Sequence, residues 1–330
     1  MTDLASGRAG TVQPTSPTKW PVRLAVAVAA LGFPFVVAND YQLHVGIFAL
    51  FVVGIGIAYD SFVGATGYRS FAHAAFLAVS AYATAILSTN GIDVGLAWLA
   101  GVVASAVTAL AIGAVVLRRV RGFVFSIVTL GFGVIVYVVA NAWVEVTRGP
   151  QGIYQIPSLS IGTFGLNSLT RYYYAVLVLA MLVHIVSLLW LRGARGRRLL
   201  AIRENEDLAE ACGLNAYLAK LSAFVFSAVL MGVMGGFYAQ YYTIVTPDLA
   251  WLQWIMLLMA IVVIAGPGHR IGVICASLFL VIGPEILRAG QSFRELLSGL
   301  LMLITVLVSP EGWTPTIKRY LARRRAAARR

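Results

Sequence analysis

The sequence predicts an all-α integral membrane protein with about ten transmembrane or re-entrant helices and a short cytoplasmic helix. Of its 330 residues, 60% are hydrophobic and only 12% are charged, about half the charged share of a soluble domain. The uncharged runs are about as long as a helix that crosses a bilayer, roughly 20 residues. They also lack the polar faces at helical spacing that a large soluble helical core needs.

Ten apolar segments fit this length criterion. In chain order they lie at 22–38, 42–59, 71–88, 96–117, 123–144, 172–191, 221–243, 251–266, 271–287 and 295–309. The first has no convincing small-residue cleavage site, so we expect a retained anchor and not a signal peptide. We therefore expect a disordered cytoplasmic N-terminus at 1–20, a transmembrane domain at 21–309 and a basic cytoplasmic tail at 310–330.

Basic residues gather between and after the apolar segments, which predicts the orientation of the chain. The net charge is +12, and arginines fill the gap at 118–121, open the loop at 192–220 and dominate the tail. Cytoplasmic loops carry such an excess of basic residues. Because the number of segments is even, both termini are expected in the cytoplasm, with the loop at 145–171 outside. The tail suits anionic membrane lipid, and no nucleic-acid partner is expected.

The loop at 192–220 contains the predicted short helix. Asn205 suits its N-cap, and Gly213 suits the position just past its C-terminus. Glu206 and Asp207 fall in the first turn, where the helix dipole favours negative charge. Four of the thirteen acidic residues of the chain lie within 204–210. In a chain so poor in charge, this concentration predicts a docking site for a soluble partner.

Two glycine-rich breaks occupy comparable places in the two halves of the chain. One spans 64–67, before the third apolar segment, and the other spans 266–272, before the ninth. Interrupted segments at corresponding positions point to a transport site near the membrane midplane. Glycine is also common where membrane helices pack closely, and the chain has 32 glycines. The breaks are therefore a weak signal by themselves.

The motifs of several enzyme classes are absent from the sequence. No phosphate-binding Gly-x-x-x-x-Gly-Lys-Ser/Thr is present, because Lys19, Lys220 and Lys318 lie in other settings. There is likewise no His-Glu-x-x-His and no Gly-x-Ser-x-Gly. Cys212 and Cys275 offer neither a disulfide framework nor metal-ligand spacing. We expect no catalytic residue, no metal site and no cofactor bound by this chain.

The predicted short helix carries a resemblance to a known family. The stretch Glu-Asp-Leu-Ala-Glu-Ala-Cys-Gly at 206–213 resembles the EAA–Gly motif of ABC importer permeases. In that family the motif forms the coupling helix, which seats in a cleft of the ATPase subunit. The resemblance assigns ATPase coupling to the matched residues, Glu206, Asp207, Ala209, Glu210, Ala211 and Gly213.

Further stretches resemble one branch of that class, the branched-chain amino-acid (LIV-type) permeases. They are Gly-Tyr-Arg-Ser-Phe-Ala-His-Ala-Ala-Phe at 67–76 with Ser-Ala-Tyr at 80–82, Arg-Gly-Phe-Val-Phe-Ser-Ile-Val-Thr-Leu-Gly-Phe-Gly at 121–133, Thr-Arg-Gly-Pro-Gln-Gly-Ile at 147–153 and Gly-Pro-Glu-Ile-Leu-Arg at 283–288. Each match is weak alone, but together they run in the family's order over roughly residues 45–290.

The resemblance implies a permease subunit in a bacterial cell (inner) membrane. Its expected partners are a second related permease subunit, two cytoplasmic ABC ATPases and an extracytoplasmic solute-binding protein. ATP and Mg²⁺ would be used by the ATPases. The expected solute is leucine, isoleucine or valine. Urea, short amides and small carboxylates are the alternatives.

His73 is our first candidate for a residue that lines the solute path. It shares one face with Ser70 at i, i+3 spacing. The path is expected to include Gly67, Ser70, Phe71, His73, Phe76, Tyr82 and Thr129. The alternative for His73 is a neutral imidazole that hydrogen-bonds a neighbouring helix.

The remaining ionisable residues near apolar segments are expected to be structural or solvated. We favour structural roles for His44 and His184, and contact with water near the membrane interfaces for Asp60 and Glu145. Glu285 is a mild candidate for an ion-binding acid inside the bundle, which a secondary transporter would need. An ion-coupled transporter and a membrane-embedded enzyme are thus the two rival classes.

The chain also departs from the family pattern within both glycine-rich breaks. Tyr68 and Arg69 stand where the family commonly has glutamine and an aliphatic residue, and Ala72 replaces a glycine. The second break keeps the glycine spacing of the family but introduces Pro267, His269 and Arg270. These departures leave the identity of the solute open more than the class of transporter.

Overall fold

The computed structural model describes residues 31–35, 39–158, 160–161, 164–165, 168–286 and 313. Most of the first predicted apolar segment and all of the last lie outside the described residues. The same is true of the predicted N-terminus at 1–20 and of nearly all of the basic tail.

Each of the eight apolar segments between these limits forms a helix. The helices are α2 (Asp40–Thr66), α3 (His73–Thr89), α4 (Val94–Arg119), α5 (Phe123–Ala142), α7 (Leu169–Leu191), α10 (Ala216–Tyr242), α11 (Leu252–Ala265) and α12 (Arg270–Ile286). Within the described part of the chain, six helical stretches are long and apolar enough to cross a membrane. The α3 helix is apolar but shorter. The predicted total of about ten is therefore not confirmed, although a mostly helical fold with helices that could cross a membrane is.

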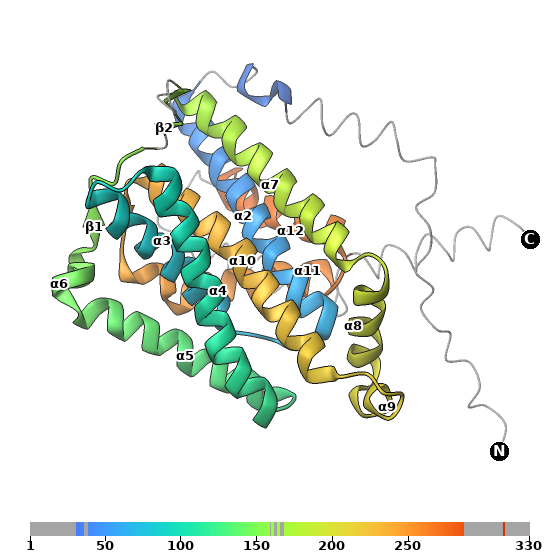
Figure 1. Cartoon of the computed structure of the whole chain (residues 1–330). Coiled ribbons are helices and arrows are strands. Elements are labelled where there is room, and N and C mark those ends of the chain that lie inside the picture. The colour runs from blue at the N-terminus through green and yellow to red at the C-terminus, as the bar shows by residue number, and fades with distance from the viewer. Residues whose placement is uncertain are drawn as a thin grey trace, which may run out of the picture.

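Two short helices join α7 to α10, and small strands lie at the other end of the bundle (Figure 1). The helices are α8 (Ala194–Glu204) and α9 (Glu206–Ala211). Around the predicted outer loop lie α6 (Val144–Thr147), η2 (Gly149–Gln151), β1 (Ile153–Tyr154), β2 (Ser160–Ile161), β3 (Phe164–Gly165), β4 (Ile244–Val245) and η3 (Pro247–Ala250). The β1 strand pairs antiparallel with β4, and β2 pairs with β3.

The α2 helix forms the centre of the bundle. In its most apolar stretch 83% of the residues are buried, against 28% in α4, α5 and α7. It packs against α7, α10 and α12, while α10 packs in turn against α3 and α4 (Figure 1). A helix that is hydrophobic all round is expected in such a central place. The outward faces of α4, α5 and α7 remain apolar and exposed.

Small residues let α3, α4 and α10 approach one another closely, as is usual between membrane helices. A Cβ placed on Gly235 of α10 would lie 2.4 Å from the carbonyl oxygen of Leu77 in α3. A Cβ on Gly101 of α4 would lie 2.6 Å from the carbonyl oxygen of Ser80. The Ser80 hydroxyl donates to the Gly232 carbonyl at 2.6 Å, which ties α3 to α10.

We predict that Gly235→Ala destabilises the bundle. The added methyl meets a backbone oxygen that cannot rotate away, and overpacking of this kind costs about 1–3 kcal/mol. The midpoint of thermal unfolding in detergent should therefore fall. Gly131→Ala in α5 is the matched control, because a Cβ at Gly131 meets nothing within 4 Å. An unchanged midpoint for Gly235→Ala would refute the close packing.

Candidate functional site

The predicted short helix is present, and both of its ends are built by the residues expected from the sequence. The Asn205 Oδ1 accepts a hydrogen bond from the Leu208 N–H at 3.0 Å, as an N-cap does. Gly213 has φ 84°, a left-handed conformation that glycine adopts readily. The N–H groups of Gly213 and Leu214 donate to the carbonyls of Glu210 and Ala209 at 2.9 and 3.1 Å. These two bonds form the Schellman motif that ends many helices.

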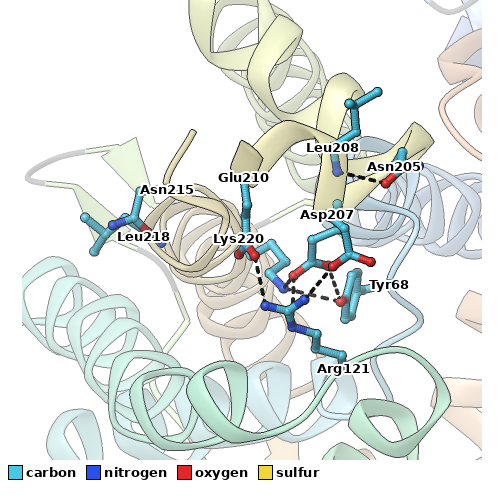
Figure 2. A network of polar contacts seen from close by, with 10 residues as sticks. Tyr68, Arg121, Asn205, Asp207, Leu208, Glu210, Asn215, Leu218 and Lys220 are labelled. Atoms are coloured by element: carbon cyan, nitrogen blue, oxygen red, sulfur yellow. Dashed lines mark hydrogen bonds and ion pairs between the residues drawn. The ribbon is translucent and has the colours of Figure 1, made fainter. Parts of the chain in front are cut away.

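The acidic side chains of α9 converge on Arg121, which lies in the turn between α4 and α5 (Figure 2). Arg121 Nη1 lies 2.9 Å from Asp207 Oδ1, and its Nη2 lies 3.0 Å from Glu210 Oε2. The Nε is 3.6 Å from Glu206 Oε1. Because the Arg121 side chain is 56% exposed, each single pair contributes little stability. Three carboxylates on one guanidinium do, however, set the direction in which α9 faces.

A second cation holds α9 from beneath. Lys220, in the second turn of α10, is only 1% exposed. Its Nζ lies 2.5 Å from Glu206 Oε1, and the Tyr68 hydroxyl donates to Glu206 Oε2 at 2.5 Å. Lys220 Nζ also donates to the Tyr68 hydroxyl at 3.3 Å and lies 4.5 Å from the centre of the Tyr68 ring. Glu206 therefore connects α9 to α10 and to the residues that follow α2.

The environment of Glu206 lowers its pKa below the ordinary glutamate value. Burial by itself raises the pKa, because it disfavours the charged form. The hydrogen bonds from Lys220 and Tyr68 and the charges of Lys220 and Arg121 favour the carboxylate and together outweigh that effect. Glu206 is therefore ionised at neutral pH, as the pairing of a buried lysine requires.

The exposed surface of α9 includes apolar side chains, which its acidic sequence did not suggest. We call this surface the outer face of α9. Leu208 is 62% exposed, and Ala211 and Cys212 are exposed as well. We did not predict Tyr68, Arg121 or Lys220 as partners of the acids. One signal was available, because Lys220 is one of three lysines in the chain and directly precedes an apolar segment. A buried cation there needs an anion.

Most of the predicted solute-path residues lie together around the irregular stretch at 67–72, between α2 and α3. The Phe71 N–H donates to Thr129 Oγ1 of α5 at 3.1 Å. The Ser126 hydroxyl, also in α5, donates to the Arg69 carbonyl at 2.7 Å. Gly67 begins the stretch with φ 77°. Tyr82 lies apart, nine residues beyond His73 and thus about 13 Å along α3.

His73 is fully buried at the start of α3 and joins two helices. Its Nδ1 shares a hydrogen bond of 3.1 Å with Ser70 Oγ, and its Nε2 shares one of 2.9 Å with Ser227 Oγ in α10. The rings that surround it, with centroids 5.0–5.8 Å away, are those of Tyr59, Phe62, Phe76 and Phe224. In this conformation both ring nitrogens of His73 are occupied by neighbouring hydroxyls.

The prediction that Asp60 is solvated is wrong. Asp60 is 3% exposed, because α2 continues to Thr66 and places this carboxylate inside the bundle. Its Oδ1 accepts from the Gly268 N–H at 2.8 Å. The two glycine-rich breaks therefore lie against each other, and a Cβ on Gly64 would be 2.6 Å from the Gly268 nitrogen.

The other ionisable candidates have varied surroundings. His44 contacts the hydroxyl of Tyr241, and Glu285 Oε1 accepts from the Tyr41 hydroxyl at 2.6 Å. Glu145 is exposed, in keeping with a solvated position. In the described ranges no three His, Cys, Asp or Glu side chains gather as metal ligands would.

We predict that acid releases α9. Because the pKa of Glu206 is lower in the folded chain than the ordinary value of 4.5, its contribution is complete at neutral pH and is lost as the pH falls through the lowered pKa. A nitroxide on the exposed Cys212, in a Cys275→Ser background, should stay immobilised from neutral pH down to the ordinary value and gain mobility below it.

The Glu206→Gln variant should be mobile already at neutral pH, since the buried Lys220 then lacks its anion. Glu204→Gln is the control, because Glu204 is exposed and makes no ion pair with the residues that the structure describes. Equal spectra for Glu206→Gln and the unsubstituted chain at neutral pH would show that Glu206 does not hold α9.

Comparison with known proteins agrees with this architecture. A protein-family model, described as branched-chain amino acid transport system, permease component, matches residues 26–307. The LivM permease protein of Salmonella typhimurium is 30% identical, over 88% of this chain and 74% of its own length. That of Escherichia coli is 29% identical, over 93% and 77%.

The Escherichia coli LivH permease protein is 26% identical, over 78% of this chain and 89% of its own length. No solved structure matches the chain significantly. With a family model that spans most of its length and two relatives that align with nearly all of it, the chain belongs to the branched-chain amino acid (LIV-type) ABC permease family.

Proposed function

We propose that this chain is the membrane-spanning permease subunit of an importer driven by separate ATPase subunits. The observation that carries the proposal is the position of α9. It is a capped two-turn helix outside the bundle, held by Arg121, Lys220 and Tyr68. A helix used only as a connection needs no such attachment to three separate segments.

The proposed assembly contains a second permease, two ATPases and a solute-binding protein. Relatives named LivM and LivH both match this chain, which supports a pair of related permeases. The ATPases, with ATP and Mg²⁺, lie on the side of α8 and α9, which is thereby the cytoplasmic side. The solute-binding protein lies at the end with the small strands. The exposed apolar faces of α4 and α5 face lipid or the second permease.

In this proposal the docking contact is made by the outer face of α9, not by its acids. Glu206 is mostly covered, and Glu210 pairs with Arg121. The exposed Leu208 offers apolar surface whose burial against a partner is favourable. The matched acids Glu206, Asp207 and Glu210 contribute by fixing the orientation of this face.

The same contacts provide a route from α9 into the membrane domain. Movement of α9 pulls on Tyr68 through Glu206, and Tyr68 precedes the stretch that ends at His73. It also pulls on the first turns of α10 through Lys220. The Ser70–His73–Ser227 bonds connect that stretch to α10. Rearrangement of these bonds opens the solute path that the predicted residues line, and alternating access follows.

The proposed solute is a branched-chain amino acid. The family model and the printed names of the relatives supply this assignment. Urea, short amides and small carboxylates remain the alternatives, because Tyr68 and Arg69 lie beside the proposed path. An ion-coupled transporter is the rival class, and the buried Asp60 is the acid that it could use. Uptake that survives ATP depletion and stops with the ion gradient would favour that rival.

We predict that Leu208→Glu abolishes co-purification of the ATPases with the permease. A charge replaces the apolar side chain without touching the contacts of Glu206. Leu218→Glu in α10 is the matched control, because Leu218 is 56% exposed but lies outside α9. It should retain the ATPases. Full co-purification with Leu208→Glu would remove α9 as the docking element.

For the solute, we expect the reconstituted importer to take up labelled leucine, isoleucine and valine in an ATP-dependent manner. Unlabelled valine should compete for leucine uptake, and urea or acetamide in equal excess should not. The vesicles without ATP are the control for leakage. Uptake of urea with no uptake of leucine would move the chain to the amide-transporting branch.

A further inference from the structure

Arg203 lies between the two glycine-rich breaks. It belongs to the last turn of α8, two residues before Asn205, the N-cap of α9. Its Nη1 donates to the Gly64 carbonyl at 2.6 Å. A Cβ on Gly67 would lie 3.1 Å from Arg203 Cγ, and a Cβ on Gly268 would lie 3.1 Å from Nη1. One side chain thus contacts glycines of both breaks.

The positions of these glycines suit close contact and bending. Gly67 and Gly268 have φ 77° and 79°, where a residue with a side chain would be strained. Gly64 is helical, but a Cβ there would meet the Gly268 nitrogen at 2.6 Å. The breaks meet because no side chain keeps them apart.

We call the contact of Arg203 with Gly64, Gly67 and Gly268 the joint. Asp60 contacts the same joint from inside the bundle. Its carboxylate accepts from the Gly268 N–H, and the guanidinium groups of Arg203 and Arg270 are its charged neighbours. Arg270 is itself fixed, since its Nη2 donates to the Ser187 carbonyl of α7 at 2.8 Å. A carboxylate buried in a membrane helix carries a cost that such partners offset.

We propose that Arg203 is a positioning residue that carries the movement of α8 and α9 into both glycine-rich breaks at once. This inference rests on the proposed function and adds a second connection to the one through Tyr68. Tyr68 leads to the stretch before α3, whereas Arg203 leads to the end of α2 and the start of α12. The two halves of the membrane domain therefore respond together.

The joint itself can be tested in the permease alone, in lipid nanodiscs, without any ATPase. Amide hydrogen exchange is measured for peptides that cover 62–72 and 264–272. Arg203→Met should speed exchange in both peptides, and Arg203→Lys should do so less. The control is Arg197→Met, because this exposed arginine of the same helix makes no side-chain hydrogen bond or ion pair with the described residues. A change in one peptide only, or in neither, overturns the joint.

The transmission step is tested in the complete reconstituted importer as solute taken up per ATP hydrolysed. We expect Arg203→Met to retain the ATPases and their hydrolysis while this ratio falls about tenfold, the effect of losing a bond with a charged donor. Arg203→Lys should recover part of the ratio, and Arg197→Met should match the unsubstituted importer.

An unchanged ratio for Arg203→Met overturns the positioning role. Loss of ATPase binding by the same variant also overturns it, because Arg203 would then belong to the docking contact. Failure of the unsubstituted permease to bind any ATPase contradicts the proposed function instead, and the exchange measurement still decides whether the joint exists. The two ideas therefore fail in different ways.

Discussion

The buried ion pair between Lys220 and Glu206 is the constraint on which the arrangement of the site depends. An ammonium group that is almost fully covered must have an anion close by, since the cost of burying an unpaired charge is several kcal/mol. Glu206, from the loop outside the apolar segments, supplies this anion at 2.5 Å. The pair brings α9 against the start of α10, and Tyr68 and Arg121 complete its surroundings.

The described part of the membrane domain uses its few polar side chains to join segments that are far apart in sequence. His73 joins the start of α3 to Ser227 in α10. Asp60 joins α2 to the turn before α12. In an apolar surrounding, a polar group without a partner is costly, so each such contact favours one arrangement over its alternatives. In the function that we propose, these contacts are the ones that break and re-form during transport.

Several sequence predictions were confirmed because they rest on local chemistry. The N-cap at Asn205 and the helix end at Gly213 depend on residues within one or two turns of chain. The apolar segments depend on composition and length alone. The prediction for Asp60 was wrong because it relied on where α2 ends. The predicted apolar segment ended at residue 59, but α2 continues through Gly64 and ends only at Gly67.

By itself, the sequence determined a helical membrane protein of the LIV-type permease family, with a capped short helix in its largest basic loop. Hydrophobicity, length and local capping are properties of neighbouring residues, so they are readable without a fold. Only the tertiary structure decided which way the acids of that helix face, because their partners come from α4–α5, from α10 and from the stretch after α2. It also decided that the two glycine-rich breaks touch. Contacts between segments some 200 residues apart, such as Gly64 and Gly268, are set by how whole helices pack, which no local pattern encodes.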